Sequence, residues 1–196
     1  MQLLKTKNVV WWVLGLWVIL SAVVFIVYQQ RYMKPLAVAI AQFEANDALR
    51  LLFKINDATT PSTKAIRVVY FWQAGCACDE FVKAHFIQMG KEYSGQDIDF
   101  MIANLSPEKP ITDSYSHYST LSLEQVNAVR ASVPMTPAVA IWSEQGELTY
   151  FGPHSLGVLC NDETSLIKKV IDSLLAGIVS QNISTVGSGC FCETPQ

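Results

Sequence analysis

Cysteine is the residue type in this chain that is best suited to chemistry. The 196 residues include five cysteines, four of which form two Cys-x-Cys pairs. The first pair, Cys76 and Cys78, follows an apolar, β-prone run ending at Trp72 and precedes a helical pattern. A helix N-terminus offers free N–H groups and a positive dipole end, which favour thiolate over thiol. The spacing therefore predicts a sulfur-based site where a strand meets a helix.

Three kinds of sulfur chemistry fit such a pair. Cys76 and Cys78 could close a disulfide with each other, and strain in the small ring would make it an oxidant or isomerase-like site. Each thiol could instead pair elsewhere in the chain. Together with the second pair, Cys190 and Cys192, they could also supply the four soft ligands of a Cu or Zn site.

Two further residues could join this chemistry. Cys160 makes the cysteine count odd, and it is either a small buried residue or a third thiol for exchange or metal binding. His154, six residues earlier, is the best-placed histidine for a metal. A histidine in a Gly-Pro loop is more often a surface residue, so we expect His154 to be exposed. We expect His85 to lie on a solvated helix face. No cofactor other than Cu or Zn is indicated.

The segment from Val9 to Tyr28 carries no charged residue and is long enough to span a bilayer. At ~1.5 Å per residue it covers roughly 30 Å as a helix. Trp11 and Trp12 lie near one end, as interfacial aromatic residues do. The run is longer than the apolar part of a signal peptide, and no small-x-small cleavage pattern follows it closely. We interpret it as an uncleaved, single-pass anchor.

Charge and cysteine usage suggest on which side of the membrane the rest of the chain lies. Lys5 and Lys7 precede the span and Arg31 and Lys34 follow it, so the positive-inside rule leans only slightly toward a cytoplasmic N-terminus. Paired thiols suit an oxidising compartment. We therefore expect a bacterial inner-membrane protein with its C-terminal domain in the periplasm. The net charge of −3 and the absence of a Lys/Arg run argue against nucleic acid as a partner.

The sequence divides into five parts. We predict an N-terminal tail (1–8), a transmembrane helix (9–28), an amphipathic helix with a linker (29–60), a folded domain (61–179) and a Cys-x-Cys tail (180–196). Within the domain, apolar runs and helical spacing alternate in the order β-α-β-α-β-β-α. This order predicts a mixed central sheet in an α/β fold. The predicted strands are Ile66–Trp72, Ile98–Leu105, Ala138–Trp142 and Glu147–Phe151; the helices are Pro35–Ile55, Asp79–Tyr93, Ser122–Ser132 and Leu166–Ile178; a loop covers Ser106–Thr120.

From Ile66 to Leu175 the sequence resembles the thioredoxin superfamily. Phe71-Trp72-x-x-x-Cys76 is similar to the strand end that introduces the nucleophilic cysteine of that family. The segment from Val133 to Ala138 is similar to the family's cis-proline segment, and Gly146 and Gly152 match two glycines around its last strand. The chain also resembles uncharacterised membrane-tethered thioredoxin-like proteins of Gram-negative bacteria.

The resemblance implies roles for particular residues. Cys76 would be the attacking thiol, and Pro137 would follow a cis peptide bond. The backbone of Thr136, the residue before that proline, would lie against a bound peptide. The sequence also departs from the family, which usually has two residues between its cysteines and a bulky residue before the first. Here Ala77 alone separates the thiols, Gly75 precedes them, and Tyr70 occupies the strand position that often holds a buried acid.

Cys190 and Cys192 follow a segment long enough for them to reach Cys76 and Cys78. The residues from Gly177 to Cys190 can extend up to roughly 40 Å, whereas the last helix runs away from the site for about 20 Å. A disordered end is the alternative. Three functions stay open: thiol–disulfide exchange with a protein partner, in which Cys78, Cys160 or the tail pair resolves the mixed disulfide; Cu or Zn binding or delivery; and a non-catalytic interaction module with structural disulfides.

Overall fold

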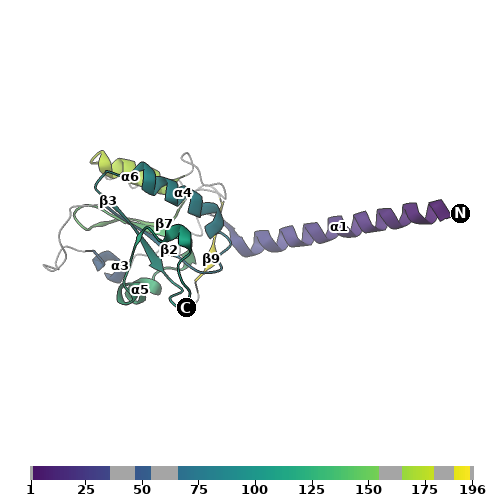
Figure 1. Ribbon diagram of the computed structural model, residues 1–196, viewed down its shortest axis with the longest axis horizontal. Coiled ribbons are helices and arrows are strands. Elements are labelled where there is room, and N and C mark those ends of the chain that lie inside the picture. Colours follow the sequence, from purple (N-terminus) through teal and green to yellow (C-terminus); the bar gives the residue numbers. More distant parts are fainter. Residues whose placement is uncertain (1, 36–46, 54–65, 155–164, 179–187, 195–196) are drawn as a thin grey trace. The chain divides into compact units, whose positions relative to one another are not determined.

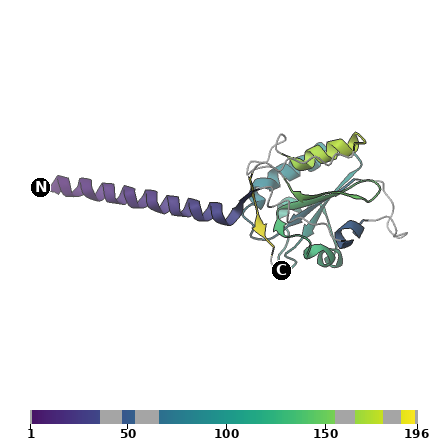
Figure 2. The same ribbon diagram turned by 180° about the vertical axis from the view of Figure 1, so that it is seen from behind.

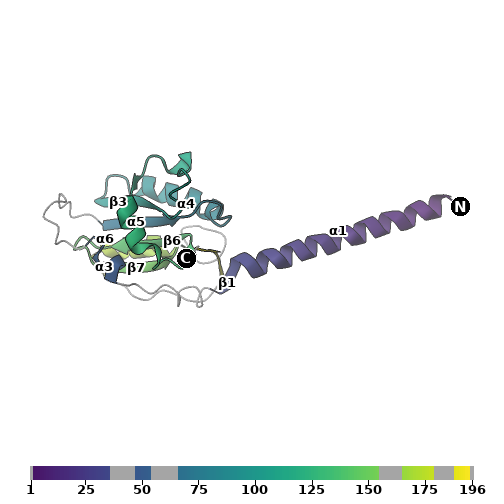
Figure 3. The same ribbon diagram turned by 90° about the horizontal axis from the view of Figure 1, so that it is seen from below.

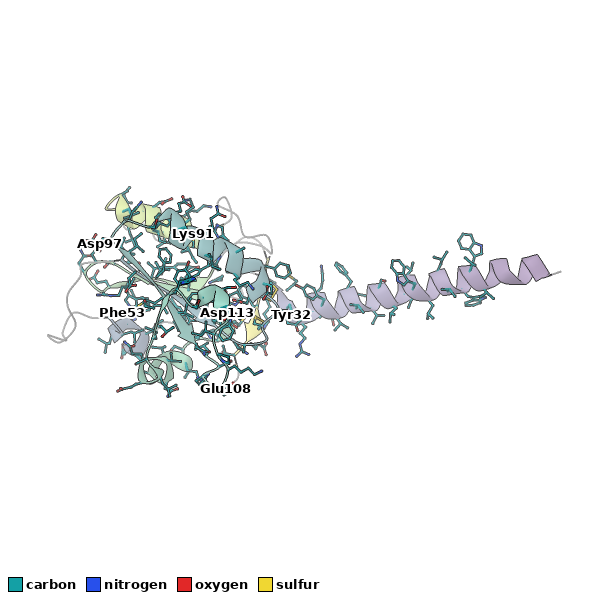
Figure 4. All side chains as sticks on the ribbon, viewed as in Figure 1. Tyr32, Phe53, Lys91, Asp97, Glu108 and Asp113 are labelled. Atoms are coloured by element: carbon teal, nitrogen blue, oxygen red, sulfur yellow. A yellow bond between two sulfur atoms is a disulfide. The ribbon has the colours of Figure 1, made fainter. Side chains whose placement is uncertain are left out.

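The computed structural model describes residues 2–35, 47–53, 66–154, 165–178 and 188–194, and it comprises two compact units, residues 1–33 and 34–196. The first unit is one continuous helix, α1 (Gln2–Tyr32), as Figure 3 shows. Within its stretch Val9–Tyr32, the most apolar 18-residue window has a mean hydropathy of 2.6 and is 0% buried within the protein. The side chains of this stretch project outward from the helix (Figure 4). An apolar helix without packing partners is consistent with a membrane anchor.

The second unit is built on a five-stranded sheet in the order β4-β3-β2-β6-β7. The central strand β2 (Ile66–Trp72) runs parallel to β3 (Ile98–Asn104) and antiparallel to β6 (Ala138–Trp142). Strand β7 (Leu148–Pro153) forms a hairpin with β6, and β4 (Ser119–Thr120) is a parallel edge strand beside β3. The mixed sheet predicted from the order of elements is therefore confirmed.

Helices cover both faces of this sheet (Figures 1 and 2). Alternate residues of β2, including Val68 and Tyr70, pack with α4 (Asp79–Glu92) and α6 (Leu166–Leu175). The residues between them, Val69 and Phe71, pack with α3 (Asp47–Leu51) and α5 (Leu123–Arg130). A strand buried on both faces reads as a continuous apolar run, which is why its position was evident in the sequence.

Some element boundaries differ from those predicted. The last helix ends at Leu175 because Gly177 has a φ of +69°, the left-handed conformation in which helices commonly stop. The predicted loop 106–120 contains the short helix η1 (Asp113–Tyr115), whose Tyr115 is fully buried, as well as β4. Most of the predicted helix Pro35–Ile55 lies outside the described residues; within it, α3 places Leu49 in the core.

Four short strands lie outside the main sheet. Strand β5 (Met135–Thr136) follows α5 directly and pairs with β9 (Cys192–Glu193). Strand β8 (Ser188–Cys190) pairs with β1 (Met33–Pro35). Residues 188–190 and 192–193 therefore form strands paired with β1 and β5, so this part of the tail is not the disordered end that was the alternative.

Candidate functional site

The first cysteine pair lies in the turn between β2 and α4. The chain leaves β2 at Trp72 and reverses through Gly75, whose φ of +80° is a conformation that an L side chain rarely adopts. This requirement explains why glycine precedes Cys76 in place of a bulky residue. The Cys76 N–H donates to the Gln73 carbonyl at 3.4 Å, and Cys78 is the N-cap residue of α4. Both thiols are thereby held at the positive end of a 14-residue helix.

The segment before Ala138 brings a cis proline against these cysteines. The Thr136–Pro137 peptide bond is cis, as the resemblance implied. The Thr136 carbonyl oxygen lies 3.6 Å from the Cys76 sulfur, and the Thr136 hydroxyl donates to Gln73 Oε1 at 3.2 Å. The roles predicted for Thr136 and Pro137 stay predictions, but the structure brings both residues to Cys76.

Two disulfides join this corner of the domain to the C-terminal tail. Cys76 is bonded to Cys192 and Cys78 to Cys190, with Cα–Cα distances of 5.7 and 5.4 Å. Figure 2 shows β9 in yellow beside α4. The small Cys76–Cys78 ring that we weighed from the sequence is therefore not formed here. Pairing with the tail avoids closing a ring across a single intervening residue.

The four cysteines differ in their access to solvent. Cys78 is fully buried and Cys76 and Cys190 are 7% exposed, whereas Cys192 is half-buried. The sulfurs of Cys76, Cys78 and Cys192 lie within 4.8 Å of one another. Thiolates are the form that binds Cu or Zn, so this cluster could hold a metal only after its disulfides are reduced. Cys160, another predicted thiol, lies outside the described residues.

A buried carboxyl group adjoins the cysteines, and the sequence analysis missed it. Asp79, the first residue of α4, is 6% exposed and accepts hydrogen bonds from Tyr70 at 2.6 Å, Tyr115 at 3.0 Å and Trp72 Nε1 at 3.3 Å. Burial raises the pKa of Asp79, while these three donors oppose the rise. Burial is also the main cause that raises the pKa of Tyr70 and Tyr115.

Asp79 is a buried acid close to the strand position at which the thioredoxin superfamily often has one. The strand position often held by a buried acid carries Tyr70 here, and the Tyr70 hydroxyl points to an acid on the following helix instead. The sequence feature that could have indicated a functional Asp79 was its position directly after Cys78, at the start of a predicted helix. That signal is ambiguous because acids in the first turn are common for dipole reasons alone.

The expectation that His154 and His85 are surface residues is wrong. His154, just after β7, is 1% exposed and His85 on α4 is 6% exposed, with ring centroids 5.1 Å apart. The His154 ring also contacts Tyr70 and Phe86, at centroid distances of 6.4 and 6.3 Å. Neither His154 nitrogen has a hydrogen-bond partner among the described residues. Burial, with a smaller contribution from His85, lowers the pKa of His154 to about 3.

The residues around His154 do not form a metal site with the cysteines in the described part of the chain. The one group of potential ligands found there is Cys76, Cys78 and Cys192, without a histidine. The hairpin after β6 directs His154 into the core between β2 and α4, where the aromatic rings surround it. His154 is therefore a core residue in this structure.

A central mixed sheet, helices on both faces, and a cysteine at a helix N-terminus facing a cis proline together define a thioredoxin-like fold. The chain belongs to the family described as "Domain of unknown function (DUF6436)", whose model matches residues 44–194. The matched range includes both Cys-x-Cys pairs. Among proteins with curated descriptions, none matches this sequence.

Solved structures resemble the fold at low sequence identity. A hypothetical protein from Sinorhizobium meliloti has a TM-score of 0.54 at 15% identity, over 68% of this chain and 80% of its own. An uncharacterized conserved protein from Geobacillus kaustophilus has a TM-score of 0.52 at 17% identity, over 68% and 78%. The thioredoxin domain of a thiol-disulfide oxidoreductase from Bacteroides vulgatus has a TM-score of 0.41 at 12% identity, over 57% and 80%.

Proposed function

We propose that this protein carries out thiol–disulfide exchange from a domain that α1 holds at the membrane, with Cys76 as the attacking thiol. The observation that carries the proposal is the position of Cys76. Its sulfur lies at the start of α4, 3.6 Å from the carbonyl oxygen before the cis proline, and is already bonded to a cysteine of a distant segment. That bond is the product expected when a thiolate at this place attacks a disulfide.

The chemistry follows from the surroundings of Cys76. Once Cys76 is reduced, the N-terminal end of α4 favours its thiolate, which attacks one sulfur of a partner disulfide. A bond forms between Cys76 and that sulfur, and the partner's second sulfur leaves as a thiolate. A neighbouring thiol then attacks the Cys76 sulfur and releases the partner. We propose Cys78 or Cys192 for this step, and the distances of less than 4.8 Å between their sulfurs and that of Cys76 support the proposal.

The location outside the cytoplasm is part of the same proposal. Two disulfides that link distant parts of the chain persist in an oxidising compartment and are rare in the cytosol. The apolar helix α1 fits a single membrane span in length and composition. We therefore propose a bacterial inner-membrane protein with its domain in the periplasm and a protein thiol or disulfide as its partner.

The proposal is tested by substituting the attacking thiol in the full chain. After reduction, Cys76→Ser should lower the rate of exchange with a small aromatic disulfide at least tenfold, because serine cannot form a mixed disulfide. Cys160→Ser is the matched control and should keep most of the wild-type exchange rate. An unchanged rate in Cys76→Ser, in a variant that unfolds at the wild-type temperature, would contradict the proposal.

A second candidate function is Cu or Zn binding by the reduced cysteines, favoured by the close approach of three sulfurs. It predicts that the reduced chain binds one Cu(I) or Zn ion tightly and that Cys78→Ser weakens this binding at least tenfold. Reduced protein that retains no metal after equilibration with either ion would remove this candidate.

A further inference from the structure

The two-residue strand β5 lies next to Cys76 but outside the main sheet. It runs immediately before the cis Thr136–Pro137 bond, and its partner among the described residues is β9 of the C-terminal tail. The two strands are antiparallel, with Thr136 opposite Cys192 and Met135 opposite Glu193. The cysteine bonded to Cys76 is therefore presented on an extended strand that pairs with the residue before the cis proline.

We infer that the tail segment Ser188–Thr194 occupies the edge of β5 that a substrate strand would use, and that the tail blocks this edge until its disulfides are reduced. This inference rests on the proposed function and adds its control. A strand of another protein that presents a disulfide to Cys76 would have to pair with β5, whose backbone is now paired with β9. The oxidised tail therefore blocks the site.

Contacts other than the disulfides show what the edge of β5 recognises. The Thr194 N–H donates to the Pro134 carbonyl at 3.1 Å, and the Thr194 hydroxyl donates to the Val133 carbonyl. These acceptors belong to the backbone, so they can bind a strand of almost any sequence. The substrate requirement that follows is a backbone N–H two residues after the reactive cysteine.

The tail also has an apolar anchor between its cysteines. Phe191 is 3% exposed. A Cβ on Gly189 would come within 2.6 Å of the Phe191 ring, so glycine at this position leaves the space that the ring occupies. Outside the anchor, Glu193 pairs with Lys34 at 2.6 Å. This ion pair is largely exposed on the glutamate side and contributes little to holding the tail.

Reduction of the two disulfides would release the tail. The solvent exposure of the four cysteines indicates which disulfide is reduced first. Cys192 is half-buried, whereas Cys78 and Cys190 are buried. A thiolate of an external dithiol attacks the Cys192 sulfur and bonds to it; the Cys76–Cys192 bond breaks, and its electron pair stays on Cys76 as a thiolate. The second thiol of the donor then releases Cys192 as a thiol. The donor is oxidised to a disulfide, and two electrons and two protons have entered the chain.

The Cys78–Cys190 bond is reduced by a second round of the same reaction, with a second dithiol. Four electrons and four protons thus convert the blocked form to one with four thiols. With both bonds open, the tail is held by non-covalent contacts, which include the β5–β9 and β1–β8 strand pairs, the Phe191 contact, the Thr194 hydrogen bonds and the Lys34–Glu193 ion pair. A substrate strand can then compete for β5.

The test compares two synthetic peptides as probes. Both carry residues 188–196 with serine at position 190 and with Cys192 activated as a mixed disulfide with pyridinethiol; one is N-methylated at Thr194. The methyl group removes the N–H that Pro134 accepts and leaves charge, side chains and the reactive sulfur unchanged. The protein is the full chain in detergent with the tail weakened by Cys190→Ser, Phe191→Ser and Cys192→Ser. Pyridinethione release gives the rate of attack by Cys76.

We expect the tail-weakened chain to react about tenfold faster with the unmethylated peptide, the effect of losing one partly buried hydrogen bond. In the oxidised wild-type chain, Cys76 should react with neither peptide, because its sulfur is bonded to Cys192. Equal rates with the two peptides would overturn the inference. Dithiodipyridine, which needs no strand pairing, separates the two proposals: if it fails to react with Cys76 as well, the proposed function itself fails.

Hydrogen exchange in the wild-type chain provides a second test that needs no substitution. The amide of Thr194 should be protected in the oxidised protein and should lose at least tenfold of its protection when both disulfides are reduced, because the tail then leaves β5. Protection that survives reduction would show that the tail is a permanent part of the domain, and would overturn the inference.

Discussion

At the scale of single residues, two ionisable side chains, Asp79 beside the cysteines and His154 in the core of the domain, lie where burial opposes their charge. Asp79 keeps three hydrogen-bond donors, so its buried carboxyl group has partners in either protonation state. His154 has none among the described residues and is held neutral by its surroundings. Removing each side chain should therefore have a different effect.

His154 should make the domain less stable at mildly acidic pH. Its folded pKa is about 3, against about 6.5 when unfolded, so between these values the unfolded state binds a proton that the folded state does not. Stability is therefore lost as pH falls below about 6.5. From pH 7.5 to 5.5 the loss from this residue is about 1.4 kcal/mol.

The substitution His154→Phe should remove this part of the pH dependence, because phenylalanine fills a similar space among Tyr70, Phe86 and His85 without titrating. Thermal unfolding at the two pH values measures the effect. The same substitution at His117, an exposed histidine, is the control and should leave the pH dependence intact. A His154→Phe variant as acid-sensitive as the wild type would contradict this explanation.

Asp79 should contribute to stability mainly as a hydrogen-bond acceptor. In Asp79→Ala, the hydroxyls of Tyr70 and Tyr115 and the Trp72 N–H lose a buried acceptor, which should cost about 3 kcal/mol. Urea unfolding measures this cost. Asp113→Ala, at an exposed acid, should cost little. Equal stability of the two alanine variants would show that the three hydrogen bonds contribute nothing.

At the scale of elements, the two disulfides connect the same pair of segments, the turn that leads into α4 and the C-terminal tail. Each closes a loop of more than a hundred residues, since the cysteines are 116 and 112 positions apart. In the chain-entropy view, one such bond stabilises the fold by roughly 4–5 kcal/mol. Once one bond is present, the other closes only a very short additional loop. Their contributions should therefore be far from additive.

The matched variant Cys78→Ser/Cys190→Ser, which keeps the Cys76–Cys192 bond, should lose much less stability than a chain without either bond. Cys76→Ser/Cys192→Ser, which keeps the Cys78–Cys190 bond, is the reciprocal variant and should lose a similarly small amount of stability. Unfolding midpoints under non-reducing conditions, compared with those of the fully reduced wild type, provide the measurement. If losing either bond costs as much as losing both, the two bonds do not close the same loop.

The elements of the domain core were readable from the sequence, whereas the contacts of the site were only partly so. The apolar run of β2 and the apolar spacing of α6 depend on neighbours in the chain, and both were predicted within a few residues. The attachment of Cys190 and Cys192 depends on partners more than a hundred positions away, which no local pattern encodes. Asp79 and His154 also depend on contacts between elements: the donors to Asp79 come from β2 and η1, and His154 reaches aromatic rings of β2 and α4.

At the scale of the whole molecule, the proposed location requires α1 to span the membrane and the domain to lie on its periplasmic side. Protease added to intact spheroplasts should digest residues 34–196 if the domain faces the periplasm. A chain lacking residues 1–33 and expressed in the cytoplasm is the control and should be protected. Protection of the full chain until the membrane is lysed would contradict the proposed orientation.

The measurement that tests the account most directly is the disulfide map of the full chain, isolated from membranes with its free thiols blocked. Trypsin yields one peptide with Cys76 and Cys78 and another with both tail cysteines, and cleavage after Phe191 separates Cys190 from Cys192. Fragmentation of the linked peptides then assigns each bond. The account predicts Cys76–Cys192 and Cys78–Cys190. A Cys76–Cys78 bond, with the tail cysteines bonded to each other or free, would contradict it.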